Sequence, residues 1–233
     1  MAHEQYIIVP SGFKPIHSFD MFGVLVDSWK LGEEQVRLFK EVIQREELDQ
    51  NVADKVIANY RALNRGEEWT TGSQKRAIID AIKIPLERHA DLQPDYLSTL
   101  YQEGIDVLRE IYEAREQALI FSTKKQEWVT QHLAPLIGNV TIPLYEGNKI
   151  DPMEFLKVGE EENSLGRRIV THTADELPEM QAAVKSELFS GKRGKTIFVN
   201  RNNTISREQI VNEGIDYYVN SLREVGYTQL TQK

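Results

Sequence analysis

Short runs of apolar and β-branched residues recur along the chain, each about as long as a β-strand. One run spans residues 15–20, and after a long interval five more follow at 118–122, 139–145, 167–173, 195–200 and 216–222. The stretches between the later runs have the apolar spacing of helices, as at 124–137 and 178–188. Strands that alternate with helices are typical of an α/β fold, so we predict a parallel sheet with crossover helices.

The interval between the first and second runs has a helical pattern almost throughout. Its apolar residues predict four helices, with stripes at 36–43 and 52–63, a third helix capped by Ser73 and a fourth from Leu97 to Ile111. We therefore expect residues 1–28 and 111–233 to form a Rossmann-like α/β core. Residues 29–110 are expected to form an inserted all-helical domain.

The composition narrows the classes of partner. Hydrophobic residues make up 40% of the 233 residues and charged residues 27%, which is ordinary for a globular protein. The net charge is −8. Binding of nucleic acid requires clustered Lys and Arg side chains to neutralise phosphates, so we expect no nucleic-acid partner.

The chain has no cysteine, which excludes disulfides, thiolate zinc sites and a cysteine nucleophile. The first 20 residues lack a basic segment followed by a long apolar one. No apolar run approaches the ~20 residues that span a bilayer. We therefore expect a cytoplasmic protein without a membrane partner.

Polar residues stand at or just after the ends of three predicted strands. Asp20 ends the first run, Ser122 ends the second, and Asp175 lies just past the run at 167–173. In an open parallel sheet, ligands bind beyond the carboxyl ends of the strands. The sequence therefore predicts that these three side chains meet at one edge of the sheet.

Four short motifs follow one another in a recognisable order. The first is "DMFGVLVDS", which begins at Asp20, and the second is "LIFSTKK", which contains Ser122. The third, "GNKIDPMEFL", offers Lys149, and the fourth, "ADELPEMQAA", contains Asp175 and Glu179. In order and spacing they resemble the motifs of the haloacid dehalogenase (HAD) superfamily, which consists mostly of phosphatases and phosphotransferases. The resemblance covers the predicted core, and the helical block lies where that family inserts a cap domain.

The resemblance implies catalytic and substrate-binding roles. Asp20 would be the nucleophile that attacks phosphorus to give an aspartyl-phosphate. Lys149 would offset the charge of the phosphoryl oxygens. Ser122 would donate a hydrogen bond to a phosphoryl oxygen, and Thr123 competes with it for this role. The expected partner is a small phosphorylated molecule.

The resemblance also implies a magnesium ion (Mg2+) as cofactor. Its ligands would be Asp20, the main-chain carbonyl of Phe22, Asp175 and water, with Glu179 one layer further out.

Simpler interpretations stay open for several of these residues. Asp175 could cap the helix that begins near Pro178, and Glu179 could be an acid favoured by the helix dipole in the first turn. Lys149 could be a solvated loop residue. His172 lies within a strand-like run and is expected to be packed rather than catalytic.

The first motif departs from the family pattern at Phe22. Phosphatases of the family have an Asp there that protonates the leaving group and later activates water, and phenylalanine can transfer no proton. Val24 replaces the usual Thr. A magnesium-dependent hydrolase, slow for lack of this acid, is therefore our first hypothesis.

Two other hypotheses remain open. One is a non-catalytic protein of the same fold that binds or regulates. The other is a hydrolase that resembles phosphonatases or dehalogenases, for which Lys75 is a candidate Schiff-base lysine. In the helical block, Arg61, Arg65 and Trp69 are candidate substrate contacts.

Overall fold

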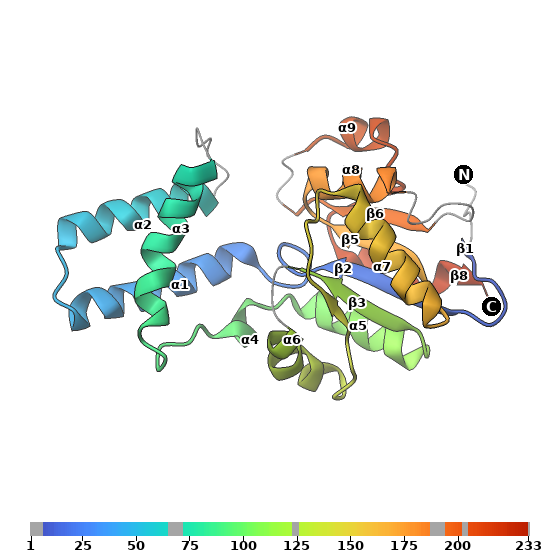
Figure 1. Cartoon of the computed structure of the whole chain (residues 1–233), viewed down its shortest axis with the longest axis horizontal. Helices are drawn as coiled ribbons and strands as arrows, with labels where there is room; N and C mark the ends of the chain where they lie inside the picture. Colours follow the sequence, from blue (N-terminus) through green and yellow to red (C-terminus); the bar gives the residue numbers. More distant parts are fainter. Residues whose placement is uncertain (1–6, 65–71, 123–125, 187–193, 202–204, 233) are drawn as a thin grey trace. The chain divides into compact units, whose positions relative to one another are not determined.

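The computed structural model describes residues 7–64, 72–122, 126–186, 194–201 and 205–232 (Figure 1). Thr123, Arg65 and Trp69 lie outside these ranges. The chain forms two compact units, one made of residues 1–25 and 101–233 and the other of residues 26–100. We describe each unit by itself.

A six-stranded, all-parallel sheet forms the centre of the first unit, as the sequence predicts (Figure 1). Its strand order is β4-β3-β2-β5-β6-β7. In chain order the strands are β2 (Lys14–Asp20), β3 (Gln117–Phe121), β4 (Leu144–Tyr145), β5 (Arg167–Ala174), β6 (Lys195–Val199) and β7 (Tyr217–Val219).

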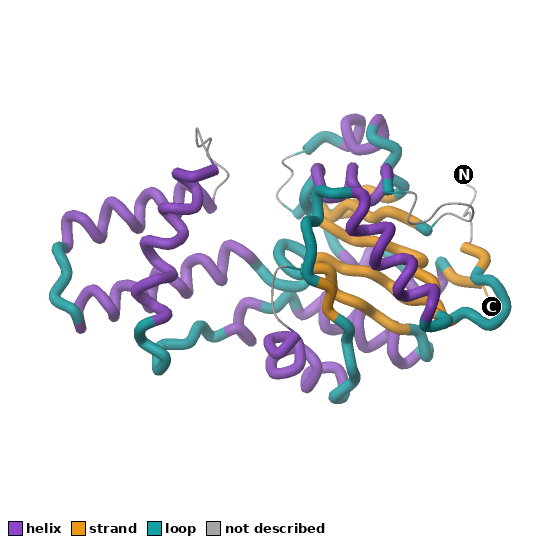
Figure 2. Tube along the Cα trace, in the orientation of Figure 1, coloured by secondary structure: helices purple, strands orange, loops and turns teal. Residues whose placement is uncertain are grey.

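Helices cover both faces of this sheet (Figure 2). On one face, α7 (Pro152–Ser164) and α8 (Leu177–Lys185) pack against apolar side chains of β2, β3 and β5. Phe155 of α7 meets Phe121 edge to face, with ring centroids 5.0 Å apart. On the other face lie α5 (Gln102–Glu113) and Tyr227, whose ring centroid is 5.3 Å from that of Phe19. Burial on both faces explains why these strands read as continuous apolar runs.

The remaining described elements of the first unit are short. β1 and β8 form a separate two-stranded parallel sheet. The bounds are β1 (Ile7–Ile8), α6 (Gln126–Trp128), a π-helical turn (Val129–Leu133), α9 (Arg207–Asn212), β8 (Thr231–Gln232) and 3-10 turns at Ala134–Ile137, Leu222–Glu224 and Tyr227–Gln229.

The strand order reverses at β2. The chain runs from β2 outward to β3 and β4 and then returns to β5, on the other side of β2. Asp20 is in register with Phe121 of β3, and Phe19 is in register with Thr173 of β5. The carboxyl ends of β2, β3 and β5 therefore lie together at the switch point where open α/β sheets bind ligands.

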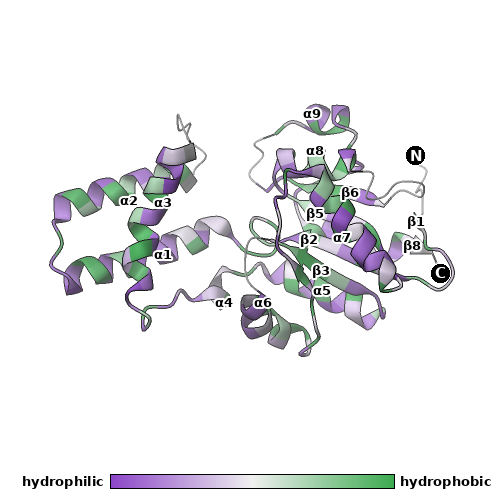
Figure 3. Cartoon of the chain, viewed as in Figure 1, coloured by the Kyte–Doolittle hydropathy of each residue, from purple (hydrophilic) through white to green (hydrophobic). Residues whose placement is uncertain are grey.

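The second unit is helical in its described residues, as the sequence predicts. Its helices are α1 (Ser28–Arg45), α2 (Gln50–Asn64), α3 (Gly72–Glu87) and α4 (Tyr96–Thr99). Apolar stretches recur between polar ones along α1, α2 and α3 (Figure 3). Phe39, Ile57 and Ile82, one from each helix, belong to a single buried cluster. Asp27 caps α1 by accepting a hydrogen bond from the Lys30 N–H.

Three local expectations were wrong. The predicted helix at 97–111 is two helices, because Leu100 and Tyr101 are extended and the Tyr101 N–H donates to Leu25 O at 2.9 Å. Helix α5 therefore belongs to the first unit, which resumes at residue 101. Ser73 lies inside α3 rather than at its cap. Of the run at 139–145, only the last two residues form a strand.

No helix within the described ranges combines the length and hydropathy needed to cross a membrane.

Candidate active site

Lys149 joins two carboxylates at the carboxyl end of the sheet. Its Nζ atom lies 2.6 Å from Asp20 Oδ1 and 2.8 Å from Glu179 Oε2. Asp20 is the last residue of β2, Glu179 lies in the first turn of α8, and Lys149 precedes α7. The Lys149 side chain is only 17% exposed, so it is not a solvated loop residue.

The turn after β2 holds Asp20 in place. Asp20 is buried, and its Oδ1 accepts a hydrogen bond from the Met21 N–H at 2.5 Å. The Leu25 N–H donates to Met21 O at 2.9 Å, which closes the turn Met21–Leu25. Phe22 is half-buried within this turn. The Asp20 carboxylate is therefore oriented by the backbone of the residues that follow it.

Asp175 faces the same turn from the end of β5. Gly23 has φ +75°, and a Cβ atom at this position would lie 1.8 Å from Asp175 Oδ2, so only glycine allows the two to come this close. Asp175 Oδ1 is buried and has no hydrogen-bond partner among the described residues. Glu176, not Asp175, is the residue before α8, and it makes no side-chain cap. The helix-capping interpretation of Asp175 is therefore wrong.

Burial raises the pKa values of all three carboxyl groups at this site. Burial raises the pKa of Asp20 to about 7, and the charge of Glu179 adds to this while Lys149 opposes it. Burial likewise raises the pKa of Glu179 to about 7 and that of Asp175 to about 8, the latter aided by Asp20. Burial alone would lower the pKa of Lys149, but Asp20 and Glu179 outweigh it and raise that pKa above its usual value. Among the described residues, Lys149 is the cation that lowers the pKa values of all three carboxyl groups, and its effect is smaller than that of burial.

His172 lies beneath this cluster and is fully buried. It packs edge to face on Phe155, as expected, with ring centroids 4.9 Å apart. Its Nε2 also lies 3.2 Å from Glu179 Oε1, and its Nδ1 lies 3.0 Å from Ser18 Oγ. Burial lowers the pKa of His172 to about 3, so the ring is neutral.

The sequence interpretation missed the contacts of Glu179 with Lys149 and His172. The sequence did offer one signal for the face of the sheet concerned: Ser18 and Asp20 are two residues apart in one strand, so their side chains point to the same face. The contact of Ser18 with His172 could not be predicted, because it depends on the pairing of β2 with β5.

Ser122 follows β3 and is buried. Its hydroxyl lies 3.7 Å from the Met21 sulfur, and its N–H donates to Tyr145 O at 3.0 Å. Ser122 is therefore brought next to the turn that follows Asp20. Its predicted competitor Thr123 is outside the described residues.

The residues at this site fit a magnesium ion. Asp175 offers a buried oxygen without a hydrogen-bond partner, and the three ionised carboxylates would carry two more negative charges than Lys149 balances. Within the part of the chain that the structure describes, no three Asp, Glu or His side chains converge as metal ligands. Magnesium commonly needs only one or two carboxylates and completes its octahedral shell with other oxygens. Asp20 and Asp175 are the carboxylates that would hold the ion, together with the Phe22 carbonyl.

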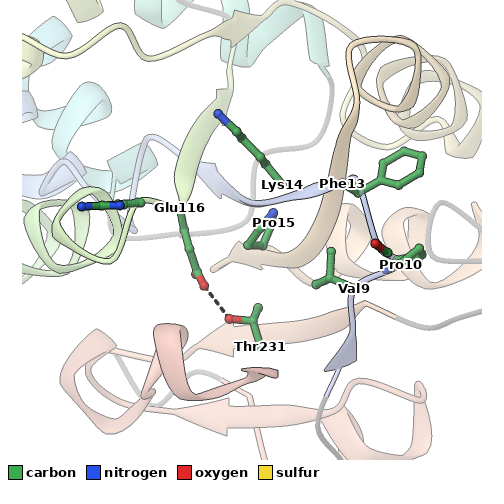
Figure 4. A pocket seen from close by; sticks show the side chains of 10 residues that line it. Val9, Pro10, Phe13, Lys14, Pro15, Glu116 and Thr231 are labelled. Atoms are coloured by element: carbon green, nitrogen blue, oxygen red, sulfur yellow. Dashed lines mark hydrogen bonds between the residues drawn. The ribbon is translucent and has the colours of Figure 1, made fainter. Parts of the chain in front are cut away.

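A cavity of about 410 Å³ lies elsewhere in the same unit (Figure 4). Pro15 near the start of β2 and Glu116 just before β3 line it, so it lies at the amino ends of the strands. Glu116 accepts hydrogen bonds from Thr231 Oγ1 at 2.5 Å and from His17 Nε2 at 2.8 Å. None of the candidate site residues lines this cavity.

Two candidate residues of the helical unit are described by the structure, Arg61 and Lys75. Arg61 forms a two-pronged ion pair with Glu33, at 2.9 and 2.6 Å. Lys75 is exposed on α3.

No family model matches the sequence, and no curated protein does. Solved structures do match. A HAD hydrolase of family IA, variant 3, from Entamoeba histolytica is 11% identical with a TM-score of 0.53, over 93% of this chain and 97% of that one. A HAD phosphatase from Thermococcus onnurineus is 14% identical with a TM-score of 0.53, over 90% and 95%. A dehalogenase solved as an intermediate complex is 15% identical with a TM-score of 0.56, over 97% and 100%. At these identities the likeness establishes a shared fold.

Proposed function

Because the chain has the fold of the haloacid dehalogenase superfamily, we propose that it is a magnesium-dependent hydrolase of a small phosphorylated molecule. The observation that carries this proposal is the position of Lys149, between the carboxylates of Asp20 and Glu179 at the carboxyl end of the sheet. A nucleophile, a cation for phosphoryl oxygens and a spare carboxylate oxygen on Asp175 occur there together. These are the parts that transfer of a phosphoryl group requires.

Asp20 would act first as the nucleophile. One of its carboxylate oxygens forms a bond to phosphorus while the bond from phosphorus to the leaving oxygen breaks, and the electron pair departs with that oxygen. Water then attacks the aspartyl-phosphate, which releases phosphate and restores the Asp20 carboxylate. Lys149, in contact with Asp20, lowers the cost of bringing this carboxylate to an anionic phosphoryl group.

Magnesium, when bound, would neutralise charge on the phosphoryl oxygens and on the carboxylates around them. Asp20, Asp175 and the Phe22 carbonyl would hold it. Glu179 contacts Lys149, so its proposed role is to orient the lysine rather than to bind the metal ion.

Phe22 limits the choice of substrate. It supplies no proton to the leaving oxygen, so leaving groups that depart as stable anions are favoured. We therefore propose acyl phosphates or phosphate esters of acidic alcohols as the preferred substrate class.

Release of inorganic phosphate from a panel of phosphorylated metabolites, with acetyl phosphate and 4-nitrophenyl phosphate added, tests the proposal. Wild type should release phosphate with magnesium and lose this activity in EDTA. Asp20→Asn, which keeps the shape of the side chain but cannot attack, should be inactive. Activity of Asp20→Asn at the wild-type level would show that the nucleophile is wrong.

A dehalogenase-like hydrolysis is the second candidate, and it is favoured by Phe22, which offers no proton to a leaving group. Attack of Asp20 on carbon would expel halide, which needs no proton. Release of chloride or bromide from 2-haloacids in EDTA would support this reaction in place of the first. If neither phosphate nor halide is released, the binding or regulatory interpretation and the phosphonatase-like one remain.

A further inference from the structure

Arg201 reaches the turn after β2 from the end of β6. Its side chain is 15% exposed. The Nε–H donates to Gly23 O at 3.1 Å, and Nη2–H donates to Val24 O at 2.9 Å. Two hydrogen bonds from one planar guanidinium to successive carbonyls restrict the rotation of both peptide groups.

The guanidinium is itself held in place on its other sides. Its Nη1 pairs with Glu103 in the first turn of α5, and its carbon lies 4.0 Å from the ring centroid of Tyr101. Glu103 also accepts a hydrogen bond from the Ser221 hydroxyl. The charge of Arg201 is thus balanced by Glu103, and its contacts with the turn are made to backbone oxygens.

The turn is therefore restrained from two directions. Arg201 binds the carbonyls of Gly23 and Val24, and Asp175 packs against Gly23. The Phe22 carbonyl and the Asp20 side chain belong to this same turn. Arg201 therefore acts on them through the backbone of the turn.

We propose that Arg201 is a positioning residue, which holds the turn Met21–Leu25 so that the Asp20 carboxylate and the Phe22 carbonyl keep the orientation that the reaction needs. The effect of Arg201 on the reaction rests on the proposed function, whereas its effect on the turn does not. It adds a residue just after β6 that the four sequence motifs do not include.

Two variants remove the pair of backbone hydrogen bonds without leaving a buried charge unpaired, which would itself destabilise the fold. Arg201→Lys keeps a charge for Glu103 but lacks the planar fork. The double variant Arg201→Gln/Glu103→Gln removes both charges. Arg207→Gln, at an exposed arginine of α9, is the matched control.

Hydrogen exchange of the metal-free proteins is the primary measurement. Amides at residues 21–25 should exchange faster in both Arg201 variants than in wild type, while exchange in β3 stays the same. Calorimetric titration should show magnesium affinity reduced roughly tenfold in both. With any substrate that wild type hydrolyses, kcat should fall about 10²-fold with little change in KM, because binding of the substrate's remote parts is unaffected. The control should match wild type.

Exchange at 21–25 that equals wild type in either variant overturns the proposal, because the turn would then not depend on the fork. A change in the double variant alone would assign the effect to the charge pair. The exchange measurement requires neither metal nor turnover, so it decides whether Arg201 holds the turn even if the proposed function fails. Failure of the proposed function is recognised separately, by a wild type that releases no product.

Discussion

Phe22 is the single residue with the largest expected consequence for the chemistry. It stands two residues after Asp20, where the family resemblance implies an acid, and it is half-buried. General acid-base catalysis contributes roughly 10²- to 10⁴-fold in rate, and its loss is most costly when the leaving group is basic. The protein should therefore discriminate steeply between leaving groups.

Phe22→Asp should reduce this discrimination. Wild type should hydrolyse 4-nitrophenyl phosphate much faster than an alkyl phosphate, because nitrophenolate departs without a proton, and the variant should narrow the ratio of the two rates. Initial rates at saturating magnesium measure it, after circular dichroism has shown that the variant is folded. An unchanged ratio in a folded variant would mean that position 22 has no part in proton transfer.

Asp175 makes the stability of the metal-free protein depend on pH. Burial raises its pKa from 3.8 to about 8. Between about pH 4 and pH 8 the folded state keeps a proton that the unfolded chain has lost, so the free energy of unfolding falls as pH rises, by at most about 1.4 kcal/mol per pH unit for this proton.

Asp175→Asn cannot ionise and should lack this contribution. In urea unfolding with EDTA at pH 5 to 8, wild type should therefore lose stability relative to the variant as pH rises. Parallel curves for the two proteins would show that Asp175 is not protonated in the folded state near neutral pH.

At the scale of elements, the turn between β2 and the helical unit has the tightest geometric requirement. Gly23 has φ +75°, and an added Cβ would collide with the Asp175 carboxylate. Gly214 has a similar φ of +76°, yet its nearest contact to an added Cβ is Val184 Cγ1 at 3.8 Å. A substitution at Gly214 therefore introduces backbone strain alone, whereas the same substitution at Gly23 adds a collision with Asp175.

Gly23→Ala should abolish magnesium binding and activity, because the turn or Asp175 must move. Gly214→Ala should cost only the strain of a left-handed residue, about 1–2 kcal/mol, and keep both properties. Thermal unfolding and calorimetric titration with magnesium give the comparison. Normal magnesium binding by Gly23→Ala would contradict the close packing of the turn on Asp175.

At the scale of the whole molecule, each unit has its own buried core. Phe39, Ile57 and Ile82 belong to the helical one, and Phe121 and Phe155 to the sheet. The Tyr101 N–H donates to Leu25 O, so the sheet unit's chain ends lie side by side where the helical unit is inserted. We therefore expect the sheet unit to fold without the helical one.

A chain in which a short Gly-Ser linker replaces residues 26–100 should unfold cooperatively and bind magnesium like wild type. Its KM should rise if the helical unit contributes substrate contacts. Circular dichroism, calorimetry and steady-state kinetics measure these properties. A deletion variant without cooperative unfolding would show that the sheet unit depends on residues 26–100.

The sequence by itself determined the class of fold and the positions of Asp20, Ser122 and Asp175 relative to the predicted strands. These features depend on local period and on motifs a few residues long, which any unfolded segment already carries. The break between α4 and α5 was not predictable, since Leu100 and Tyr101 are extended by pairing with distant residues of the chain.

Only the tertiary structure decided which partners these residues have. Glu179 reads locally as a first-turn acid, but the folded sheet brings it to Lys149. Arg201 reaches Gly23 across a sequence separation of 178 residues, and no local pattern reports that contact. Contacts between residues so far apart in the sequence depend on strand order and helix packing. The neighbours of a side chain across a sheet are set by the register of the strands rather than by spacing along the chain.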